Sequence, residues 1–252
     1  MMLSVIIIAK NEAGNMRDCI ESVAWADEIV LVDSGSEDDT VNIARSMGVR
    51  VYVHADWPGF GPQKNRALSY ATGDWVLSID ADERVTPELR KEIEMAMQDP
   101  MAEGYYCPRL SQFIGKFIHH SGWYPDYVLR LFRRNAGKFS DSLVHEIVRL
   151  DGKTARLKNP LLHYSYLTQG DVERKVEQYS SAAAKQMHEA GKRAGLLSAI
   201  LRGGWAFFRT YLLRLGILDG LAGFQIARMN ARTTYLKYRK LVDLNRISPR
   251  RA

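Results

Sequence analysis

The first hundred residues alternate between short apolar runs and segments with a helical spacing of apolar positions. Strands are predicted at the four apolar runs Leu3–Ile8, Glu28–Val32, Arg50–His54 and Trp75–Ile79. Helices are predicted between and after them, near residues 14–24, 37–47, 62–72 and 87–98. This order is typical of an α/β fold with a mostly parallel sheet, in which ligands bind at the carboxyl ends of the strands.

The pattern changes twice further along the chain. Short strand-like runs at Tyr105–Leu110, Tyr127–Arg133 and Leu143–Leu150 are broken by Gly, Pro and Asn, which predicts an antiparallel extension of the sheet. Beyond Thr168 a helical region is predicted to about residue 244, because no proline occurs between residues 160 and 249. We therefore expect two domains, residues 1–165 and residues 166–252.

Polar residues follow the predicted strands. The four polar turns are Ala9-Lys10-Asn11-Glu12, Asp33-Ser34-Gly35-Ser36, Gln63-Lys64-Asn65-Arg66 and Asp80-Ala81-Asp82. Carboxyl ends of parallel strands share one edge of a sheet, so these side chains should lie close together. Two carboxylates one residue apart suit a Mg²⁺ or Mn²⁺ ion that also contacts substrate phosphates. The alternative for Asp80-Ala81-Asp82 is a solvated turn before a helix capped by Thr86, with Pro87 at its first position.

These motifs resemble those of family 2 glycosyltransferases, which have the Rossmann-like GT-A nucleotide-sugar-binding fold, over roughly residues 3–165. The family usually opens with Thr-Tyr-Asn-Glu, and this chain departs from it at Ala9-Lys10. The resemblance implies that Glu12 and Asp33 hold the nucleoside, that Lys64 lies near uracil or phosphate, and that the Asp80 motif serves sugar, ribose and metal. We expect the donor to be bound by Ala9, Asn11, Glu12, Asp33, Ser34, Gly35, Lys64, Arg66, Asp80 and Ala81.

A cation is expected beside the donor. The nucleotide diphosphate leaving group gains negative charge as the glycosidic bond breaks, and Mg²⁺ or Mn²⁺ together with Lys64 or Arg66 would stabilise that charge. The resemblance implies a histidine ligand in addition to the aspartates, and His163 and His145 both remain candidates. We expect the metal ligands to be Asp80, Asp82, His163 and His145. A packed, hydrogen-bonded His163 is the alternative.

An inverting transfer also requires a base that deprotonates the acceptor hydroxyl. Many family members use a Glu-Asp pair, and the corresponding stretch of this chain reads His-Glu. We predict that Glu146 is the base, with Asp126 and Asp141 as lesser candidates. A structural salt bridge between Glu146 and Arg130 or Arg149 is the alternative.

Charge is divided unevenly between the predicted domains. Residues 1–165 contain 19 Lys+Arg and 23 Asp+Glu, a net charge of −4, whereas residues 166–252 contain 16 and 6, a net charge of +10. A helical wheel over Leu196–Leu218 places six large residues on one face, with Arg202 and Arg209 on its flank. The six are Leu201, Trp205, Phe208, Tyr211, Leu212 and Leu215. No uncharged apolar run of about 18 residues occurs, so we expect a helix that lies in an anionic membrane interface. The alternative is that this face belongs to the core.

A narrower resemblance is to the bacterial lipopolysaccharide inner-core β-1,4-glucosyltransferases. It rests on Ala9-Lys10-Asn11-Glu12, Trp123-Tyr124-Pro125-Asp126, Val144-His145-Glu146 and His163-Tyr164-Ser165-Tyr166. It implies an inverting enzyme that moves glucose from UDP-glucose to a core heptose on a membrane glycolipid. Because two cysteines are too few for a disulfide framework and no signal peptide is visible, we expect a cytoplasmic protein, peripheral on the inner face of the bacterial inner membrane.

Other functions fit the chain less well. Another lipid-linked acceptor, a protein acceptor, and a non-catalytic nucleotide-sugar-binding module all remain alternatives. A nucleic-acid partner is not expected, since no binding motif accompanies the basic charge. A dinucleotide oxidoreductase is excluded because the first strand is not followed by Gly-x-Gly-x-x-Gly.

Overall fold

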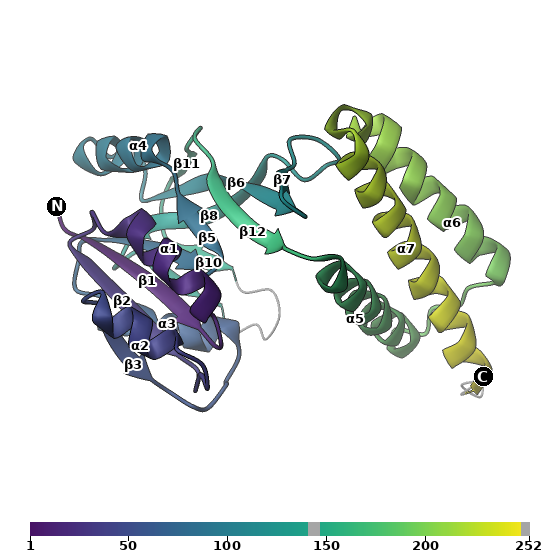
Figure 1. Cartoon of the computed structure of the whole chain (residues 1–252), viewed down its shortest axis with the longest axis horizontal. Helices are drawn as coiled ribbons and strands as arrows, with labels where there is room; N and C mark the ends of the chain where they lie inside the picture. The colour runs from purple at the N-terminus through teal and green to yellow at the C-terminus, as the bar shows by residue number, and fades with distance from the viewer. Residues whose placement is uncertain (141–146, 248–252) are drawn as a thin grey trace. The chain divides into compact units, whose positions relative to one another are not determined.

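A computed structural model describes residues 1–140 and 147–247 of the 252-residue chain (Figure 1). The chain forms two compact units. The first comprises residues 1–110 and 126–163, and the second comprises residues 111–125 and 164–252. Residues 111–125, which the sequence places within the first domain, thus belong to the second unit.

The first unit is built around a mostly parallel sheet. Its strands are β1 (Leu3–Ala9), β2 (Glu28–Asp33), β3 (Arg50–Val53), β4 (Trp75–Asp80), β5 (Glu83–Val85), β6 (Gly104–Phe113), β8 (Asp126–Arg133), β11 (Thr154–Arg156) and β12 (Leu161–Tyr166). The order is β3-β2-β1-β4-β8-β6-β12-β5, with β11 paired to β6. The strands β3, β2, β1 and β4 are mutually parallel, whereas β8 runs antiparallel to β4 and to β6. The predicted α/β class and the antiparallel extension are confirmed.

Helices cover both faces of the parallel strands. They are α1 (Ala13–Val23), α2 (Thr40–Ser46), α3 (Phe60–Tyr70) and α4 (Pro87–Gln98). All seven residues of β1 are buried, as expected for a parallel strand covered on both sides. Val5 and Ile7 pack in one core with Met16 of α1, while Ile6 packs in the other core with Ala67 of α3. The predicted cap of α4 is also present, because Thr86 Oγ1 accepts a hydrogen bond from the Leu89 amide at 3.1 Å.

Glu28 joins the amino-terminal ends of neighbouring strands. Its buried carboxylate accepts hydrogen bonds from the Ser4 hydroxyl of β1 and from the Thr72 amide, and it forms an ion pair with Arg50 of β3. Burial alone would raise the pKa of Glu28, but these hydrogen bonds and the Arg50 charge lower the pKa below its ordinary value. The ionised carboxylate therefore stabilises the sheet.

We expect Glu28→Gln to lower the free energy of unfolding by about 1–3 kcal/mol at pH 7, the usual cost of losing hydrogen bonds to a charged group. A lowered pKa contributes stability above the unfolded-state pKa of about 4.3, and that stability is lost as the pH falls through the folded-state pKa. The difference between wild type and variant should therefore shrink in urea titrations below about pH 4.3. The exposed Glu21→Gln is the matched control and should leave the unfolding midpoint unchanged at both pH values.

A two-stranded hairpin is anchored to α3. It pairs β9 (Gly137–Phe139) with β10 (Val148–Leu150). The Asn65 side chain of α3 donates to the Phe139 carbonyl and accepts from the Phe139 amide, both at 2.9 Å. A strand was predicted at Leu143–Leu150; its last three residues form β10, and residues 143–146 of that stretch lie outside the described residues.

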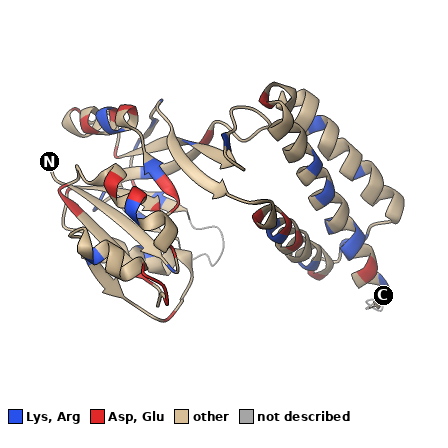
Figure 2. Cartoon of the chain, viewed as in Figure 1, with Lys and Arg blue, Asp and Glu red and all other residues tan. Residues whose placement is uncertain are grey.

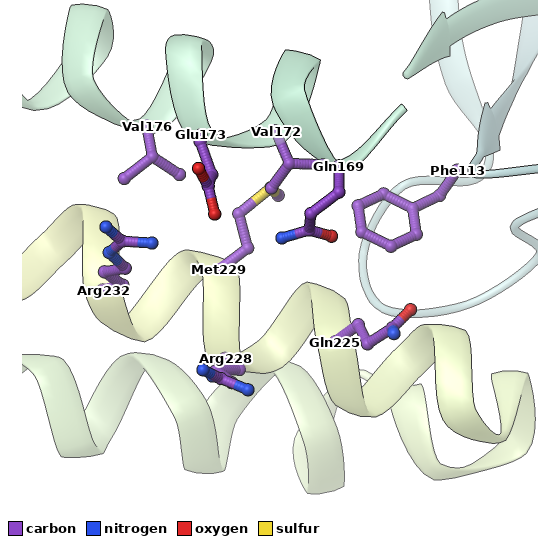
Figure 3. Close-up of a pocket in the computed structure, with 9 residues that line it drawn as sticks. All are labelled: Phe113, Gln169, Val172, Glu173, Val176, Gln225, Arg228, Met229 and Arg232. Carbon is purple, nitrogen blue, oxygen red and sulfur yellow. The ribbon is translucent and has the colours of Figure 1, made fainter. Parts of the chain in front are cut away.

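The second unit is mainly helical. After β7 (Lys116–Phe117) it contains α5 (Gln169–Glu189), α6 (Leu196–Phe208), the π-helical turn η1 (Arg209–Leu213), the 3₁₀ turn η2 (Gly216–Asp219) and α7 (Leu221–Ile247). A groove of about 270 Å³ lies between α5 and α7, with Val172, Val176 and Met229 among its lining residues (Figure 3). In the described part of the chain, every helix is too short or too polar to cross a bilayer.

The helix expected across residues 196–218 ends early. It stops after Leu213, because Leu215 adopts a left-handed backbone conformation with φ +54°. Leu215 is therefore not on the helical face on which the wheel placed it. The other five residues of that face lie on α6 and η1, which continues α6 directly.

Candidate active site

The polar turn after β2 is organised by Asp33. Its buried carboxylate accepts hydrogen bonds from the amides of Gly35 and Ser36, each at 2.9 Å. Gly35 has φ +80°, and a Cβ there would lie 3.3 Å from the backbone of Ala55, so glycine is favoured. The Ser34 hydroxyl accepts a hydrogen bond from Gln63 of α3 at 2.9 Å. Asp33 thus holds the turn in one shape at the end of its strand.

The turn after β1 interlocks with the turn after β2. The Ala9 carbonyl accepts from the Ser34 amide at 2.8 Å. Asn11 has φ +57°, and its amide donates to the Ser36 hydroxyl at 2.8 Å. The carboxylate of Glu12 is partly buried, and this burial, with the nearby charge of Asp82, raises the pKa of Glu12. These predicted donor-binding residues therefore lie at one edge of the sheet.

Asp80 belongs to a network of four charged side chains. Its carboxylate lies 2.9 Å from the Lys64 ammonium and 2.6 Å from Nη2 of Arg130. The same Arg130 nitrogen lies 2.6 Å from the carboxylate of Glu83, which is fully buried. Burial opposes ionisation of Asp80, but Arg130 and Lys64 hold the pKa of that carboxyl well below its ordinary value. The Asp80 carboxylate is therefore ionised, and it is held by the positively charged side chains of Lys64 and Arg130.

Asp82 has different surroundings from Asp80. Its carboxylate lies 3.3 Å from Nε2 of His163, a residue of β12 that pairs with Glu83 of β5. The intervening Ala81 is buried, and its carbonyl accepts from Arg84 at 2.7 Å. Three or more His, Cys, Asp or Glu side chains that could hold a metal are not found together anywhere within residues 1–140 and 147–247. His145 lies outside the described residues.

A cavity of about 460 Å³ opens beside Asp80. It is lined by Lys64, Asp80, Tyr106, Arg109, Tyr127, Val128, Leu129, Arg130, Phe139, Ile147 and Val148. These residues come from α3, β4, β6, β8 and the β9–β10 hairpin. A concave site with aromatic rings and a few convergent charges is a typical binding site for a small polar ligand.

Two predicted residues pair with charges other than Lys64 and Arg130, and Arg109, one of their partners, also lies 3.7 Å from Glu83 of the Asp80 network. Arg66 forms an ion pair with Asp56 at 2.5 Å. Asp126, a lesser candidate for the base, lies 2.6 Å from Arg109, and Arg109 in turn lines the cavity. The other candidate bases, Asp141 and Glu146, lie outside the described residues.

The sequence interpretation did not identify Arg130, Glu83 or Arg109 as parts of the site. Arg130 is buried within an otherwise apolar stretch of β8, and Glu83 begins a fully buried strand. A charged residue inside an apolar strand pattern was the available signal, since such charges are rarely buried without a partner. The partner could not be named because β4 and β8 are separated by fifty residues.

Comparisons with known proteins identify the family. The family model described as Glycosyl transferase family 2 matches residues 4–150, more than half of the chain. The chain belongs to this family. The lipopolysaccharide core biosynthesis glycosyltransferase LpsC of Rhizobium meliloti is 32% identical over 98% of this chain and 94% of LpsC. An uncharacterized glycosyltransferase of Rickettsia felis is 31% identical over 95% of this chain and 89% of its own length.

Solved structures support the same fold. The crystal structure of S. aureus TarS 1-349 is 18% identical, covers 98% of this chain and 92% of its own, and has a TM-score of 0.50. The predicted GT-A fold of this glycosyltransferase is thereby confirmed. A glucosyl-3-phosphoglycerate synthase from Mycobacterium tuberculosis, in complex with Mn²⁺ and UDP-glucose, covers 44% of this chain with a TM-score of 0.37. That similarity is too low for individual residues to be aligned.

We expect Arg130→Gln to destabilise the first unit by about 3–5 kcal/mol, because Asp80 and Glu83 would keep a buried charge without its main partner. Denaturant unfolding monitored by circular dichroism measures the loss. Arg66→Gln is the matched control, since it removes an exposed Arg–Asp pair, and it should leave the midpoint nearly unchanged. Equal stability of the two variants would contradict the structural importance of the buried network.

Proposed function

We propose that this family 2 glycosyltransferase moves glucose, with inversion, from UDP-glucose to a heptose of a lipopolysaccharide inner core. The observation that carries the proposal is the position of Asp80 at the carboxyl end of β4, where it lines a cavity together with Lys64 and Arg130. Asp82 follows two residues later in the sequence. The similarity to LpsC over nearly the whole chain supports a lipopolysaccharide core as acceptor. Because such an acceptor is a membrane glycolipid, we propose that the enzyme works peripherally on the cytoplasmic face of the inner membrane.

In this proposal the interlocked turns after β1 and β2 bind the nucleoside. Asp33 is buried and already hydrogen-bonded by its own turn, so it fixes the shape of the nucleoside pocket. Glu12 is only partly buried and can accept hydrogen bonds from ribose hydroxyls. Lys64 and Arg130 then lie on the diphosphate side, where Asp80 holds both cations in place.

The balance of charge supports a divalent cation beside the donor. Lys64, Arg109 and Arg130 are matched by Asp80, Glu83 and Asp126, so this network has no surplus positive charge for a diphosphate. The carboxylate of Asp82 and the imidazole of His163 form a donor set that suits Mg²⁺ or Mn²⁺, with diphosphate oxygens as further ligands. When bound, the cation would neutralise charge on the leaving diphosphate. Asp80 would hold Lys64 and Arg130 against the same diphosphate.

Glu146 is the proposed base. The chain lines the cavity at Phe139 and again at Ile147, so Glu146 directly precedes a residue of the cavity wall. A carboxylate there would take the proton of the acceptor hydroxyl as that oxygen attacks the anomeric carbon. Asp126 is the less favoured candidate because its carboxylate is paired with Arg109.

Purified protein should consume UDP-glucose in the presence of Mg²⁺ or Mn²⁺ and transfer glucose to a lipopolysaccharide core that ends at the inner-core heptose. A panel of UDP, GDP and ADP sugars, analysed by mass spectrometry of donor and acceptor, tests donor and acceptor together. Transfer to another lipid-linked saccharide or to a protein, with the core unchanged, would contradict the proposed acceptor.

Two variants test the site in the same assay. Asp82→Asn should weaken metal-dependent UDP binding by about 10–100-fold, the usual effect of disturbing a metal site. Asp80→Asn should also weaken UDP binding, because Lys64 and Arg130 lose their shared anchor. Asp99→Asn, an exposed substitution at the end of α4, is the control and should bind UDP as the wild type does. Undiminished UDP binding by both site variants would refute the assignment.

Glu146→Gln should lower kcat by about 10²–10⁴-fold, the usual contribution of a general base, while leaving the Kd for UDP unchanged. The reason is that the base acts on the acceptor and has no contact with the donor nucleotide. Single-turnover transfer and calorimetric UDP binding separate the two effects. If UDP binding is lost instead, Glu146 has a structural role, and if Asp126→Asn alone abolishes transfer, Asp126 is the base.

A further inference from the structure

The helix α6 packs on α7 mainly through small residues, and Phe207 is a large residue of α6 that also meets α7, at the Phe224 ring. Ala199, Gly203 and Ala206 are buried on the side that packs on α7, which runs alongside α6 in the second unit (Figure 1). A Cβ at Gly203 would lie 3.2 Å from the Cβ of Tyr235 and 3.3 Å from the carbonyl oxygen of Ala231. Around Gly203 the two helices therefore approach closely, and a larger side chain would not fit there.

The large apolar residues of α6 lie on the opposite face. Leu197, Leu201 and Trp205 are 69%, 64% and 56% exposed, and Phe208 and Leu212 continue the same face. We call these five residues the outer face. A helix that serves only its own core buries large side chains and exposes small or polar ones. In α6 the small residues are buried and the large apolar residues are exposed. The outer face therefore has the composition of a surface that binds a partner.

The charge of the residues around α6 indicates which kind of partner the outer face would bind. Between residues 190 and 240 the chain contains ten Lys and Arg residues and one carboxylate, Asp219 (Figure 2). Asp219 is buried, where it accepts a hydrogen bond from the Ser121 hydroxyl at 2.7 Å. Arg239 and Lys240 are paired with Asp243 and Glu177, which lie outside this range. The charged side chains of α6 and η1 themselves, Arg202 and Arg209, are both positive. Arg202 lies on the flank, where it stacks over the Tyr238 ring at 4.8 Å.

We propose that the outer face of α6 and η1 inserts in the plane of a membrane interface that is rich in anionic lipids. Acyl chains would cover Leu201, Trp205 and Phe208, while Arg202 and Arg209 reach lipid phosphates from the flank. The thirteen residues of α6 span about 20 Å, too short to cross a hydrocarbon core of about 30 Å. This proposal rests on the proposed function in one respect: an enzyme that acts on a glycolipid acceptor has to reach a membrane.

A second copy of the chain is a poorer partner for this face. A twofold contact centred on it would bring Arg202, Arg209 and Arg214 against the same residues of the other copy. No exposed carboxylate between residues 190 and 240 could compensate these charges. Lipid phosphates supply the missing negative charge, at about 1 kcal/mol for each basic residue near an anionic membrane surface.

The test is flotation of the full-length protein with vesicles of phosphatidylcholine alone or with added phosphatidylglycerol. The triple substitution Leu201→Ser, Trp205→Ser, Phe208→Ser should weaken binding to the anionic vesicles by at least about tenfold, through lost apolar burial. The matched control, Met95→Ser with Met101→Ser, removes exposed apolar residues of the first unit and should bind as wild type does. Arg202→Gln with Arg209→Gln should abolish the preference for anionic vesicles.

Two further measurements, of tryptophan fluorescence and of UDP-glucose hydrolysis, test the same proposal. Trp205 fluorescence should be quenched by brominated lipids, and Trp205→Phe should lose that quenching. Wild-type binding by the triple variant would overturn the proposal, as would a wild-type dimer that the triple variant converts to a monomer. Hydrolysis of UDP-glucose by the triple variant should equal that of wild type. If wild type floats with vesicles but uses no nucleotide sugar, the proposed function fails and the membrane surface stands.

Discussion

The ion pairs of Arg130 with Asp80 and Glu83 join β8 to β4 and β5. They lie where the parallel part of the sheet meets the antiparallel part, so the network holds both halves of the catalytic unit at a fixed separation. A buried guanidinium is tolerated only with close anionic partners, and each carboxylate here is similarly dependent on Arg130. Lys64 adds a second cation, which leaves the network neutral. The proposed donor site is thus built on charges that stabilise one another.

The register of the parallel strands determines where the polar turns lie. Ala9 lies opposite Asp33, and Ile8 lies opposite Asp80, so the polar turns after β1, β2 and β4 emerge side by side. The turns then bind to one another through backbone and side-chain hydrogen bonds, such as that from the Asn11 amide to Ser36. A nucleotide that spans these turns would contact preformed donors and acceptors, which limits the entropy lost on binding. The antiparallel strands contribute the aromatic wall of the cavity.

Hydrophobic periodicity was sufficient to predict the four parallel strands to within a residue or two, because each is a short apolar run bounded by polar turns. The turns contain residue types that bind phosphates and cations, and their gathering at one edge of the sheet was also predictable. The partners of those residues were not. The pairing of Asp80 with Arg130 depends on which antiparallel strand lies beside β4, and the local sequence does not determine that. His163 was expected near Asp82 only because of the family resemblance, and the two side chains do lie 3.3 Å apart. Similarly, nothing in the sequence showed that Arg66 would form an ion pair with Asp56.

The C-terminal helices show a different limit of sequence reasoning. A helical wheel correctly grouped Leu201, Trp205 and Phe208, but it could not tell whether that face was inside or outside. Ala199, Gly203 and Ala206 determine which face of α6 is buried. Their small side chains allow α7 to approach this face more closely than larger residues would permit. Close backbone packing, together with the contact of Phe207 and Phe224, stabilises the helix pair without Leu201, Trp205 and Phe208. Those three side chains therefore remain exposed. Exposure of these large apolar side chains therefore costs the helix pair little of its own folding stability.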